Sequence, residues 1–447
     1  MSYAAAIDQL NAMAPELYTR PGQPRRKFSL DEVRTLLAAL GDPHRRIRAM
    51  LVAGTNGKGS TASTLASILT ASGVRAGLYT SPHLERVNER IRMDRAEIAD
   101  DAFGRLYFRV HDVAQKLVLE GSLPQLPSFF EILTAQAMLY FAEEKVELAV
   151  LEVGMGGRLD ATNVVDPLLS IITDISLDHT EWLGSTITAI TREKAGILRR
   201  GGTMITLSQH PEANQALGEA ATELGVRAVN ASAFMPLTGA GPVASYSVEA
   251  LGATVEVASP LTGAHQQRNI ALAIAAASEL ASVHGFPVTP AAIAEGIRQT
   301  RWPGRLEHIK QGRVEAGGVE WILDVAHNPA GAWALYLGLT NLLSEERHRR
   351  LLIFSCLRDK PVAEMAQILF PLFDQVIFAP IHSARAAAIE DMEAAARATG
   401  TSTLSAGSVR QALQWARERG QSGVVVVSGS VYLVGEARSL LFAGGFE

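Results

Sequence analysis

The segment IRAMLVAGTNGKGSTASTLASIL, residues 47–69, constrains the fold more than any other part of this sequence. A short apolar run predicts a strand that ends at Ala53, and a helix-like run follows from near Ser60. Between them lie three glycines, Gly54, Gly57 and Gly59. Glycines let backbone N–H groups turn inward, and the start of a helix adds the positive end of its dipole. The segment therefore predicts a phosphate-binding loop, in which Lys58 supplies a charge for the terminal phosphates.

The spacing of this loop departs from the standard P-loop, which has four residues between its first glycine and the Gly-Lys pair. Here two residues separate Gly54 from Gly57, and Gly59 stands between Lys58 and Ser60. Ser60 is placed to bind Mg²⁺, as P-loop hydroxyls do. A tight strand-to-helix turn is the plainer interpretation of a glycine pair. The lysine, the hydroxyl and the strand–helix context together favour nucleotide binding.

Short apolar runs alternate with longer helix-period segments along the whole chain, which predicts an α/β fold with a parallel sheet. The main strand candidates are MLVAG, RAGLYTS, ELAVLEV, LLSIITDI, GTMITL, WILDVA, RLLIFSCL, QVIFAP and GVVVVSG. With 447 residues the chain is long enough for two or three domains. We place the main junction at QTRWPGRLEHI, which predicts domains at 1–299 and 300–447, and we expect a small β-hairpin within residues 226–262.

Charge and composition exclude several classes of function. A formal net charge of -5 gives no basic field for a nucleic-acid partner. No apolar run approaches the roughly 20 residues that span a bilayer, and the first residues do not resemble a secretory signal. The single cysteine, Cys356, excludes an internal disulfide and a multi-cysteine zinc site. We expect a cytoplasmic enzyme without a membrane partner.

Acidic and imidazole side chains follow two of the predicted strands. Glu152 ends the run ELAVLEV, and Asp178 and His179 follow LLSIITDI. Carboxyl ends of parallel strands border the crevice in which α/β sheets bind ligands. Beside a phosphate loop, such an acid normally binds the Mg²⁺ that bridges the β- and γ-phosphates. A lone histidine is more often structural, but this neighbourhood favours a role in the site.

The loop GTNGKGST and the order of further motifs resemble the Mur ligase superfamily, and within it the dihydrofolate synthases and folylpolyglutamate synthases. The other motifs are TSPHLERVNERI, LEVGMGGRLDATN, SLDHTEWLG, REKAG, WPGRLE, DVAHNPAG and SGSVYLVGE. They extend from about residue 50 to residue 436. The resemblance implies a Mur-ligase-like P-loop ATPase domain with a parallel sheet, followed by a smaller Rossmann-like α/β domain.

The resemblance also implies a magnesium centre with two sites. Ser81, Glu152 and His179 are expected to reach the metal ions, with Ser60 of the loop. Lys194 of TREKAGIL would most simply lie on a solvated helix face, but the matching lysine of the family is carbamylated and supports the second metal. We therefore expect a carbamylated Lys194.

An acceptor pocket is implied for the residues after Glu152 and for a pair of aromatics. GGRLDATN carries Arg158, Leu159 and Asp160, for which a loop with an Asp-led helix cap is the plainer interpretation. In the family this stretch contacts the pterin-bearing substrate. The expected partners from LPSFFEIL are Ser128, Phe129, Phe130 and Glu131, although adjacent aromatics are usually core residues.

The second domain is expected to close over the nucleotide. Arg305 is placed to reach back to the phosphates, and Asp324 is suited to a ribose hydroxyl. The resemblance implies that Asn269 contacts the adenine side of ATP. It also implies that His327, Asn328 and the stretch Ser428–Ser430, with Ser430 as a substrate contact, border the nucleotide and glutamate sites. Cationic candidates for the incoming amino acid are Arg358, Lys360 and Arg385.

These residues predict an ATP-dependent ligase that adds L-glutamate to dihydropteroate, to tetrahydrofolate or to both through an acyl phosphate. Lys58, Lys194, His179 and Arg305 are the predicted catalytic residues, and the protein is expected to act as a monomer. The nearest alternative is a cell-wall Mur ligase, which carries a UDP-sugar domain before the loop, where this sequence has 53 residues. A non-catalytic nucleotide-gated protein is a second alternative, against which the presence of Glu152, His179 and Lys194 argues.

Overall fold

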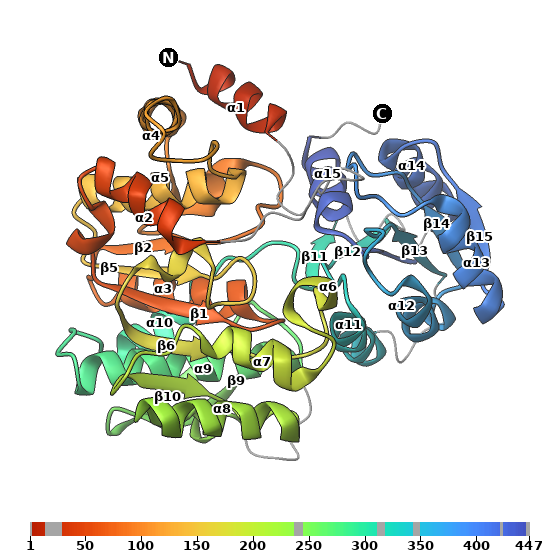
Figure 1. Cartoon of the computed structure of the whole chain (residues 1–447). Coiled ribbons are helices and arrows are strands. Elements are labelled where there is room, and N and C mark those ends of the chain that lie inside the picture. The colour runs from red at the N-terminus through yellow and green to blue at the C-terminus, as the bar shows by residue number, and fades with distance from the viewer. Residues whose placement is uncertain are drawn as a thin grey trace.

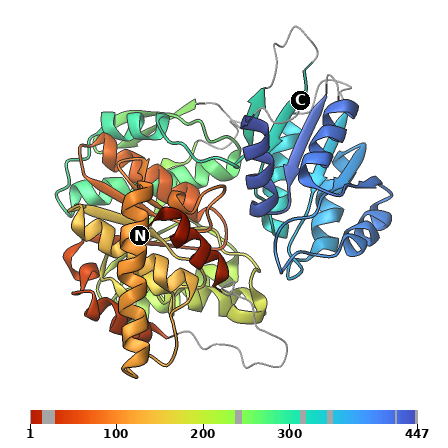
Figure 2. The same cartoon turned by 90° about the horizontal axis from the view of Figure 1, so that it is seen from above.

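The computed structural model describes residues 2–13, 29–236, 245–310, 318–342, 349–420 and 423–443. These residues form two α/β lobes, each built on a mostly parallel sheet; the larger lobe contains the elements up to Arg298, and the smaller lobe contains those from Glu307 onward (Figure 1). Seen from above, the lobes lie side by side, each with its own sheet (Figure 2). The α/β class expected from the alternation of strands and helices is confirmed.

The larger lobe contains an eight-stranded sheet in the order β4-β3-β2-β5-β1-β6-β7-β8. The six strands from β2 to β8 in this order are parallel, and β3 and β4 form an antiparallel edge. The strands are β1 (Ala49–Ala53), β2 (Ala76–Tyr79), β3 (Ile91–Met93), β4 (Ala96–Glu97), β5 (Leu148–Glu152), β6 (Pro167–Ile172), β7 (Thr203–Thr206) and β8 (Arg227–Asn230). Strands β1 and β5 are buried along their whole length, as expected for parallel strands covered on both faces.

Helices cover both faces of this sheet and enclose two apolar cores. One core contains residues of α1, α2, α4, α5, α7 and α8, and the other contains residues of α3, α9 and α10. The helices of this lobe are α1 (Tyr3–Ala12), α2 (Leu30–Ala39), α3 (Lys58–Ala71), α4 (Asp100–Leu119), α5 (Phe129–Glu143), α6 (Thr180–Leu183), α7 (Ile187–Ala195), α8 (Pro211–Leu224), α9 (Ala264–Ser282) and α10 (Pro290–Arg298). This three-layer arrangement leaves the ends of the strands as the open edges of the sheet.

A separate hairpin packs against the second of these cores. Strands β9 (Ser245–Ala250) and β10 (Ala253–Ala258) pair in antiparallel fashion, and Val248, Val255 and Val257 point into the core. The hairpin lies within the stretch 226–262 for which the sequence predicts one. Residues 237–244 of that stretch lie outside the described residues.

The smaller lobe contains a six-stranded sheet in the order β11-β12-β16-β13-β14-β15, in which only β11 is antiparallel to its neighbour. Its strands are β11 (Glu307–Lys310), β12 (Glu320–Leu323), β13 (Arg350–Phe354), β14 (Gln375–Phe378), β15 (Ser402–Ser405) and β16 (Val424–Ser428). Its helices are α11 (Pro329–Leu342), α12 (Val362–Leu369), α13 (Ile389–Thr399), α14 (Val409–Arg419) and α15 (Val431–Phe442). Two further cores lie on the two faces of this sheet.

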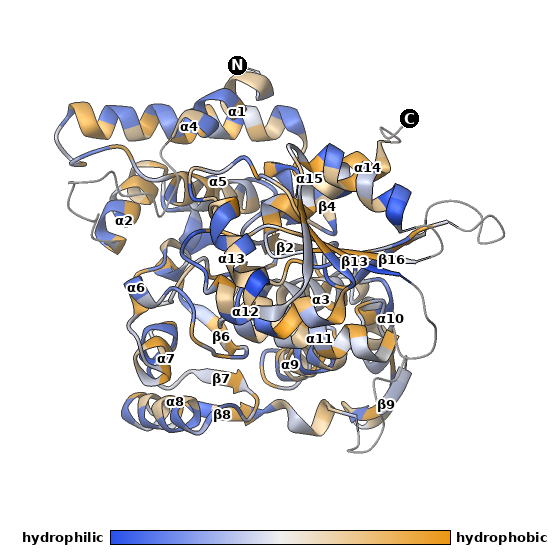
Figure 3. Cartoon of the chain, turned by 90° about the vertical axis from the view of Figure 1, so that its right-hand side faces the viewer, coloured by the Kyte–Doolittle hydropathy of each residue, from blue (hydrophilic) through white to orange (hydrophobic). Residues whose placement is uncertain are grey.

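The distribution of hydropathy follows this layering. Strands β13 and β16 are mostly apolar, whereas the outer helix α4 shows alternating apolar and polar residues (Figure 3). None of the helices in the described ranges combines the length and the apolar character that crossing a membrane requires.

Candidate functional site

The glycine loop joins the end of β1 to the start of α3, as the sequence predicts. The backbone N–H groups of Thr55 and Asn56 donate to the carbonyl of Asp174 at 2.8 and 3.2 Å, which ties the loop to the end of the neighbouring strand β6. Gly57 is the N-cap of α3 with φ of 88°, a conformation that favours glycine. A Cβ atom at Gly57 would lie 2.1 Å from Oδ1 of Asn269, so helix α9 covers the loop closely.

The first turn of α3 presents unsatisfied donors to this loop. The first four N–H groups of a helix have no intrahelical acceptor, and no side chain caps this helix. The hydroxyl of Ser60 is buried and has no hydrogen-bond partner within the described structure. Nζ of Lys58 donates to the carbonyl of Thr55 at 3.1 Å. These groups are the elements of an anion site at a helix N-terminus.

Four candidate segments meet at the carboxyl edge of the large sheet, because β2, β5, β1 and β6 are neighbours in it. The backbone N–H of Ser81, just after β2, donates to Oε2 of Glu152 at 3.1 Å. Burial raises the pKa of Glu152, and the charge of Lys58 and the bond from Ser81 act in the opposite direction. A buried carboxylate with so few donors is suited to a cation.

Lys194, from α7, is buried in this same region, with 4% of the residue exposed. Its Nζ donates to the carbonyl of Gly54 in the glycine loop at 2.7 Å. Burial, and then the charge of Lys58, lower the pKa of Lys194 to about 7. The plainer interpretation of a solvated helix face is therefore wrong, and the amine is substantially neutral near pH 7.

The second lobe reaches this edge through Asp178. Nζ of Lys360 donates to Oδ1 of Asp178 at 2.5 Å, and Nδ2 of Asn328 donates to Oδ2 at 3.0 Å. Asn328 also exchanges hydrogen bonds with Asn56 of the glycine loop, at 3.0 and 3.3 Å. Burial would raise the pKa of Asp178, but the charges of His179 and Lys360 more than reverse this, so the pKa lies below its usual value. The two lobes are thus in contact directly over the loop.

The candidate metal ligands do not form an all-protein cage. Among the described residues, no group of three His, Cys, Asp or Glu side chains converges as a metal site. Burial lowers the pKa of His179 to about 3, so its imidazole is neutral and able to act as a ligand. Mg²⁺ keeps several waters and is normally held by one or two carboxylates together with substrate phosphates. Glu152 and the unpartnered hydroxyl of Ser60 fit such a sparse site.

The predicted acceptor residues at the start of α5 serve first to begin the helix. Oγ of Ser128 accepts from the backbone N–H of Glu131 at 3.3 Å, and the Glu131 carboxylate accepts from the N–H of Ser128 at 2.7 Å. This is a capping box. Phe129 and Phe130 follow it and are half-buried, and the ring of Phe130 lies 5.9 Å from the ring of Tyr79.

The second predicted acceptor stretch is organised by Asp160. Its carboxylate accepts from the backbone N–H groups of Met155 and Thr162, at 2.9 and 3.0 Å, and from the Thr162 hydroxyl at 2.6 Å. Asp160 is the N-cap of the short 3₁₀ helix Ala161–Val164, so the Asp-led cap expected as the plainer interpretation is present. Arg158 is exposed and pairs with Glu193 at 3.5 Å, and Leu159 is exposed.

The structure places the predicted residues of the second lobe at or near the lobe contact. Asp324 is buried and accepts from the N–H groups of Leu306 and Ala326, both at 2.9 Å. Ser430 is the N-cap of α15. Nε2 of His327 lies 3.8 Å from Oδ2 of Asp178, and Arg305 lines a small cavity that includes residues of both lobes.

Two of the three cations predicted to bind the incoming amino acid instead form bonds within their own loop. Arg385 binds both oxygens of Asp359 at 2.8 Å, and Nη2 of Arg358 donates to the carbonyl of Ala384 at 2.7 Å. The third, Lys360, pairs with Asp178 across the lobes.

Sequence reasoning missed a second contact between the lobes. Arg438 of α15 binds Glu307 at 3.0 Å and also pairs with Glu85, which lies four residues after Ser81. Oγ of Ser439 donates to Glu85 at 2.7 Å. A Cβ atom at Gly435 would lie 1.9 Å from the carbonyl oxygen of Leu84, so α15 rests directly on the segment that carries Ser81. Single charged residues form no motif, so the sequence does not indicate an ion pair between positions more than 350 residues apart.

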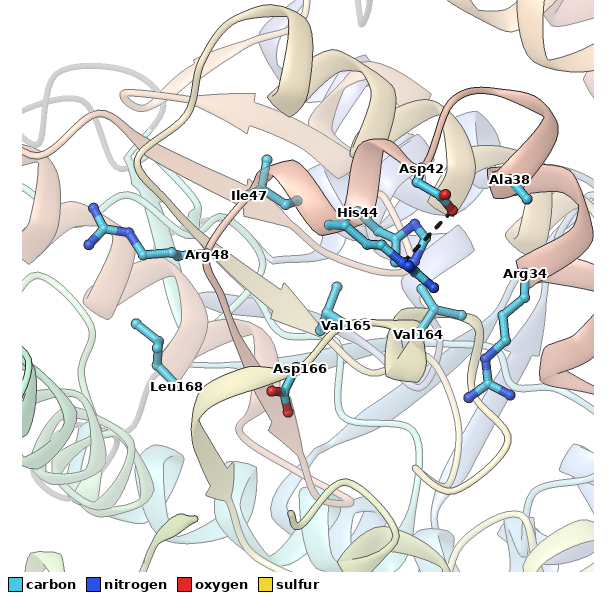
Figure 4. Close-up of a pocket in the computed structure, with 11 residues that line it drawn as sticks. Arg34, Ala38, Asp42, His44, Ile47, Arg48, Val164, Val165, Asp166 and Leu168 are labelled. Atoms are coloured by element: carbon cyan, nitrogen blue, oxygen red, sulfur yellow. Dashed lines mark ion pairs between the residues drawn. The ribbon is translucent and has the colours of Figure 1, made fainter. Parts of the chain in front are cut away.

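A cavity of about 530 Å³ lies away from these residues, beside the opposite ends of β1 and β6 (Figure 4). Arg34 and Arg48 point apart in this view, and Arg45 pairs with Asp42. Nε of Arg48 donates to the carbonyl of Glu147. Because these cations do not converge, the cavity is not part of the candidate site.

Comparisons with known proteins agree with this geometry. Residues 52–277 match the Mur ligase middle domain, and residues 304–431 match the Mur ligase, glutamate ligase domain. The chain is 34% identical over 453 residues to folylpolyglutamate synthase of Lacticaseibacillus casei, covering 99% of this chain and 100% of that one. It is 33% identical over 429 residues to the dihydrofolate synthase/folylpolyglutamate synthase of Bacillus subtilis, covering 93% and 95%. It is also similar to the solved structure of FolC of E. coli in complex with DHPP and ADP, with a TM-score of 0.83, 30% identity, and 99% and 98% of the chains covered.

Proposed function

Because this chain belongs to the Mur ligase family, in its branch of folylpolyglutamate and dihydrofolate synthases, we propose which substrates its ATP-dependent ligase reaction uses and which residues carry it out. The acceptor is dihydropteroate, a reduced folate, or both, and L-glutamate is joined to its carboxylate. The observation that supports this most directly is the set of buried polar groups around the glycine loop, formed by the unpartnered hydroxyl of Ser60, the carboxylate of Glu152 and the amine of Lys194.

We assign nucleotide binding to the larger lobe, with residues 1–299 as the ATP domain and 300–447 as the glutamate-ligase domain. The N–H groups at the start of α3 receive the phosphates, and Lys58 places its charge at the terminal phosphate. Asn269, directly over Gly57, is positioned for the adenosine part. Arg305 and Asp324 supply further nucleotide contacts from the second lobe.

We propose that Glu152, Ser81, His179 and Ser60 would hold Mg²⁺ in two sites. When bound, the metal neutralises charge on the transferring phosphoryl group. The Ser81 N–H fixes one oxygen of the Glu152 carboxylate, which leaves the other oxygen for a cation. Transfer to the acceptor carboxylate gives an acyl phosphate and ADP, and the glutamate amine then displaces phosphate as the amide forms.

We propose that Lys194 is carbamylated. A free amine, not an ammonium ion, adds to CO₂, and the product is a carbamate anion and a proton. With a pKa of about 7, roughly half of the Lys194 side chains are neutral at pH 7, whereas an ordinary lysine is about 0.1% neutral or less. The neighbouring charge of Lys58 would stabilise the resulting anion.

The acceptor pocket is assigned to the two caps described above. Phe129 and Phe130 offer flat apolar faces to a heterocycle, and Arg158, Leu159 and Asp160 border its other side. His327 and Ser430 are assigned to the glutamate side. Contact between the lobes through Asn328 and Lys360 excludes water from the acyl phosphate, which would otherwise be hydrolysed.

We propose that the enzyme is bifunctional and acts as a monomer, since the described residues of one chain supply both sides of the cleft. The test is a side-by-side assay of dihydropteroate and tetrahydrofolate with ATP, Mg²⁺ and L-glutamate, following ADP and the amide product. Product from both acceptors is expected. Product from tetrahydrofolate alone would contradict bifunctionality. Product from neither, with turnover of a UDP-linked peptide, would favour the cell-wall alternative.

A further inference from the structure

Arg90 is a buried cation that forms no ion pair within the described structure. It ends the 3₁₀ helix Val87–Arg90, immediately before β3, and only 6% of the residue is exposed. Its nearest arginine neighbours in sequence are both paired, Arg86 with Asp100 at 2.6 Å and Arg92 with Glu97 at 3.7 Å. Within the described ranges no carboxylate forms an ion pair with Arg90, and its Nη1 is buried without any hydrogen-bond partner.

The guanidinium is held in place on two sides. Its Nε donates to Nδ1 of His83 at 2.9 Å. Burial, and then the charge of Arg90, lower the pKa of His83 to about 3, so the ring is neutral and carries its proton on Nε2. The guanidinium carbon lies 4.9 Å from the centre of the Phe129 ring. An arginine fixed by a hydrogen bond and a ring loses little further freedom when it binds a ligand.

The position of Arg90 identifies the kind of ligand. Its carbonyl accepts from the N–H of Thr80, the residue before Ser81, and its charge acts on Glu152. It is therefore close both to the proposed metal ligands and to the aromatic Phe129 of the acceptor pocket. A buried, unsatisfied guanidinium donor is costly unless an anion completes it.

We propose that Arg90 binds the acceptor carboxylate that is phosphorylated and then joined to glutamate. This inference rests on the proposed function. Nη1 donates to one carboxylate oxygen and fixes the acceptor with its reacting group toward the terminal phosphate of ATP. His83 acts as a positioning residue that holds the guanidinium. The nucleotide phosphates have Lys58 and the start of α3, and the incoming glutamate is assigned to His327 and Ser430 of the second lobe, so the acceptor carboxylate is the anion expected on the side of Arg90.

The experiment compares two ligands on the wild-type protein and three variants. Dihydropteroate and an analogue that lacks its carboxylate are titrated into wild-type protein, Arg90→Met and the control Arg86→Met, whose arginine is exposed in the same segment. Wild type and Arg86→Met should prefer dihydropteroate, and Arg90→Met should lose roughly ten- to hundredfold in that preference while it binds the analogue as wild type does. Arg90→Lys, which keeps the charge and a donor, should lie between them and serves if Arg90→Met does not fold.

Three results would overturn the inference. Equal loss of both ligands in Arg90→Met would assign Arg90 to the shape of the pocket. Unchanged preference with a raised Mg²⁺ requirement would assign it to support of Glu152. Unchanged binding throughout would remove it from the site. Failure of the proposed function is a separate outcome, since wild-type protein itself would then convert neither folate acceptor to product.

Discussion

The nucleotide side and the acceptor side of the cleft differ in how far their polar side chains are already satisfied. Around the glycine loop, Ser60 has no partner and Lys194 is a buried amine with a lowered pKa. On the acceptor side, Ser128 and Glu131 complete each other, and Asp160 accepts three hydrogen bonds from its own loop. The groups around the glycine loop are available to bind ligands, whereas the groups on the acceptor side stabilise the local backbone structure. Mutations should therefore cost activity on one side and stability on the other.

The largest effect is expected from Lys194→Met. Removal of this amine should lower kcat by roughly 10²–10³-fold, the range seen when a transition-state charge loses its stabilising group. Stability should change little, because the cost of burying the amine in the wild-type protein offsets the loss of its bond to the Gly54 carbonyl. The measurement is ADP formation under saturating substrates together with thermal unfolding. A variant with unchanged kcat would show that Lys194 is not a source of catalysis.

Glu152→Gln should have the next largest effect. The amide keeps the shape of the carboxylate and can still accept from Ser81, but it loses the charge that attracts a cation. The Mg²⁺ concentration for half-maximal rate should rise by roughly 10–100-fold. Rate is measured against Mg²⁺ at fixed ATP. Because burial raises the pKa of Glu152, this variant should also unfold at a slightly higher temperature in the absence of ligands. An unchanged Mg²⁺ requirement would contradict the assignment.

The pH dependence of Lys194 sharpens the comparison further. Below pH 7 the amine is protonated and cannot add CO₂, so at fixed dissolved CO₂ the rate of reactivation of CO₂-depleted enzyme should rise about tenfold from pH 6 to pH 8. ¹³C NMR with labelled bicarbonate detects the carbamate. The folded-state pKa lies below the unfolded value, so the unfolding free energy of uncarbamylated protein should increase with pH from about 7 to 10. Lys194→Met, the control, should show neither effect.

Much of the fold was predictable because buried parallel strands are near-continuous apolar runs. Strands β1, β5 and β16 are buried throughout and stand out in the sequence. The edge strands β8 and β15 are partly exposed and carry polar residues, so no apolar run marks them. The position of a strand in the sheet thus decides whether the sequence reveals it.

The position of a candidate site residue was predictable where the residue ends a buried strand or lies in the glycine loop, as Glu152 and Lys58 do. It was not predictable where a contact joins distant segments, as with Asn56 and Asn328 or with Glu85 and Arg438. Arg90 was missed for another reason. Two other arginines and two glutamates surround Arg90 in ERVNERIR, and only its burial distinguishes it as the arginine without an ion-pair partner.

Asp160→Ala tests the acceptor side. The change leaves the N–H groups of Met155 and Thr162 without their acceptor, so the free energy of unfolding should fall by about 1–3 kcal/mol. Chemical denaturation measures this fall, and the KM for dihydropteroate is measured on the same protein below its unfolding temperature. A large rise in KM with unchanged stability would show that Asp160 binds the acceptor directly. That result would remove the distinction drawn between the two sides.

Ser128→Ala should have the smallest effect and gives the cleanest test of that distinction. Loss of an N-cap hydroxyl costs about 1 kcal/mol of stability. The matched control is Ser408→Ala, because Ser408 caps α14 in the other lobe through the same bond to the third helical residue, at 3.1 Å. Both variants should lose similar stability, and neither should change kcat or the KM for ATP.

The KM for dihydropteroate tests whether Ser128 does more than shape the pocket. It should change less than about twofold in Ser128→Ala, since Glu131 and the aromatic residues stay in place. A rise confined to Ser128→Ala, at equal loss of stability, would show that its hydroxyl leaves the cap to bind the acceptor.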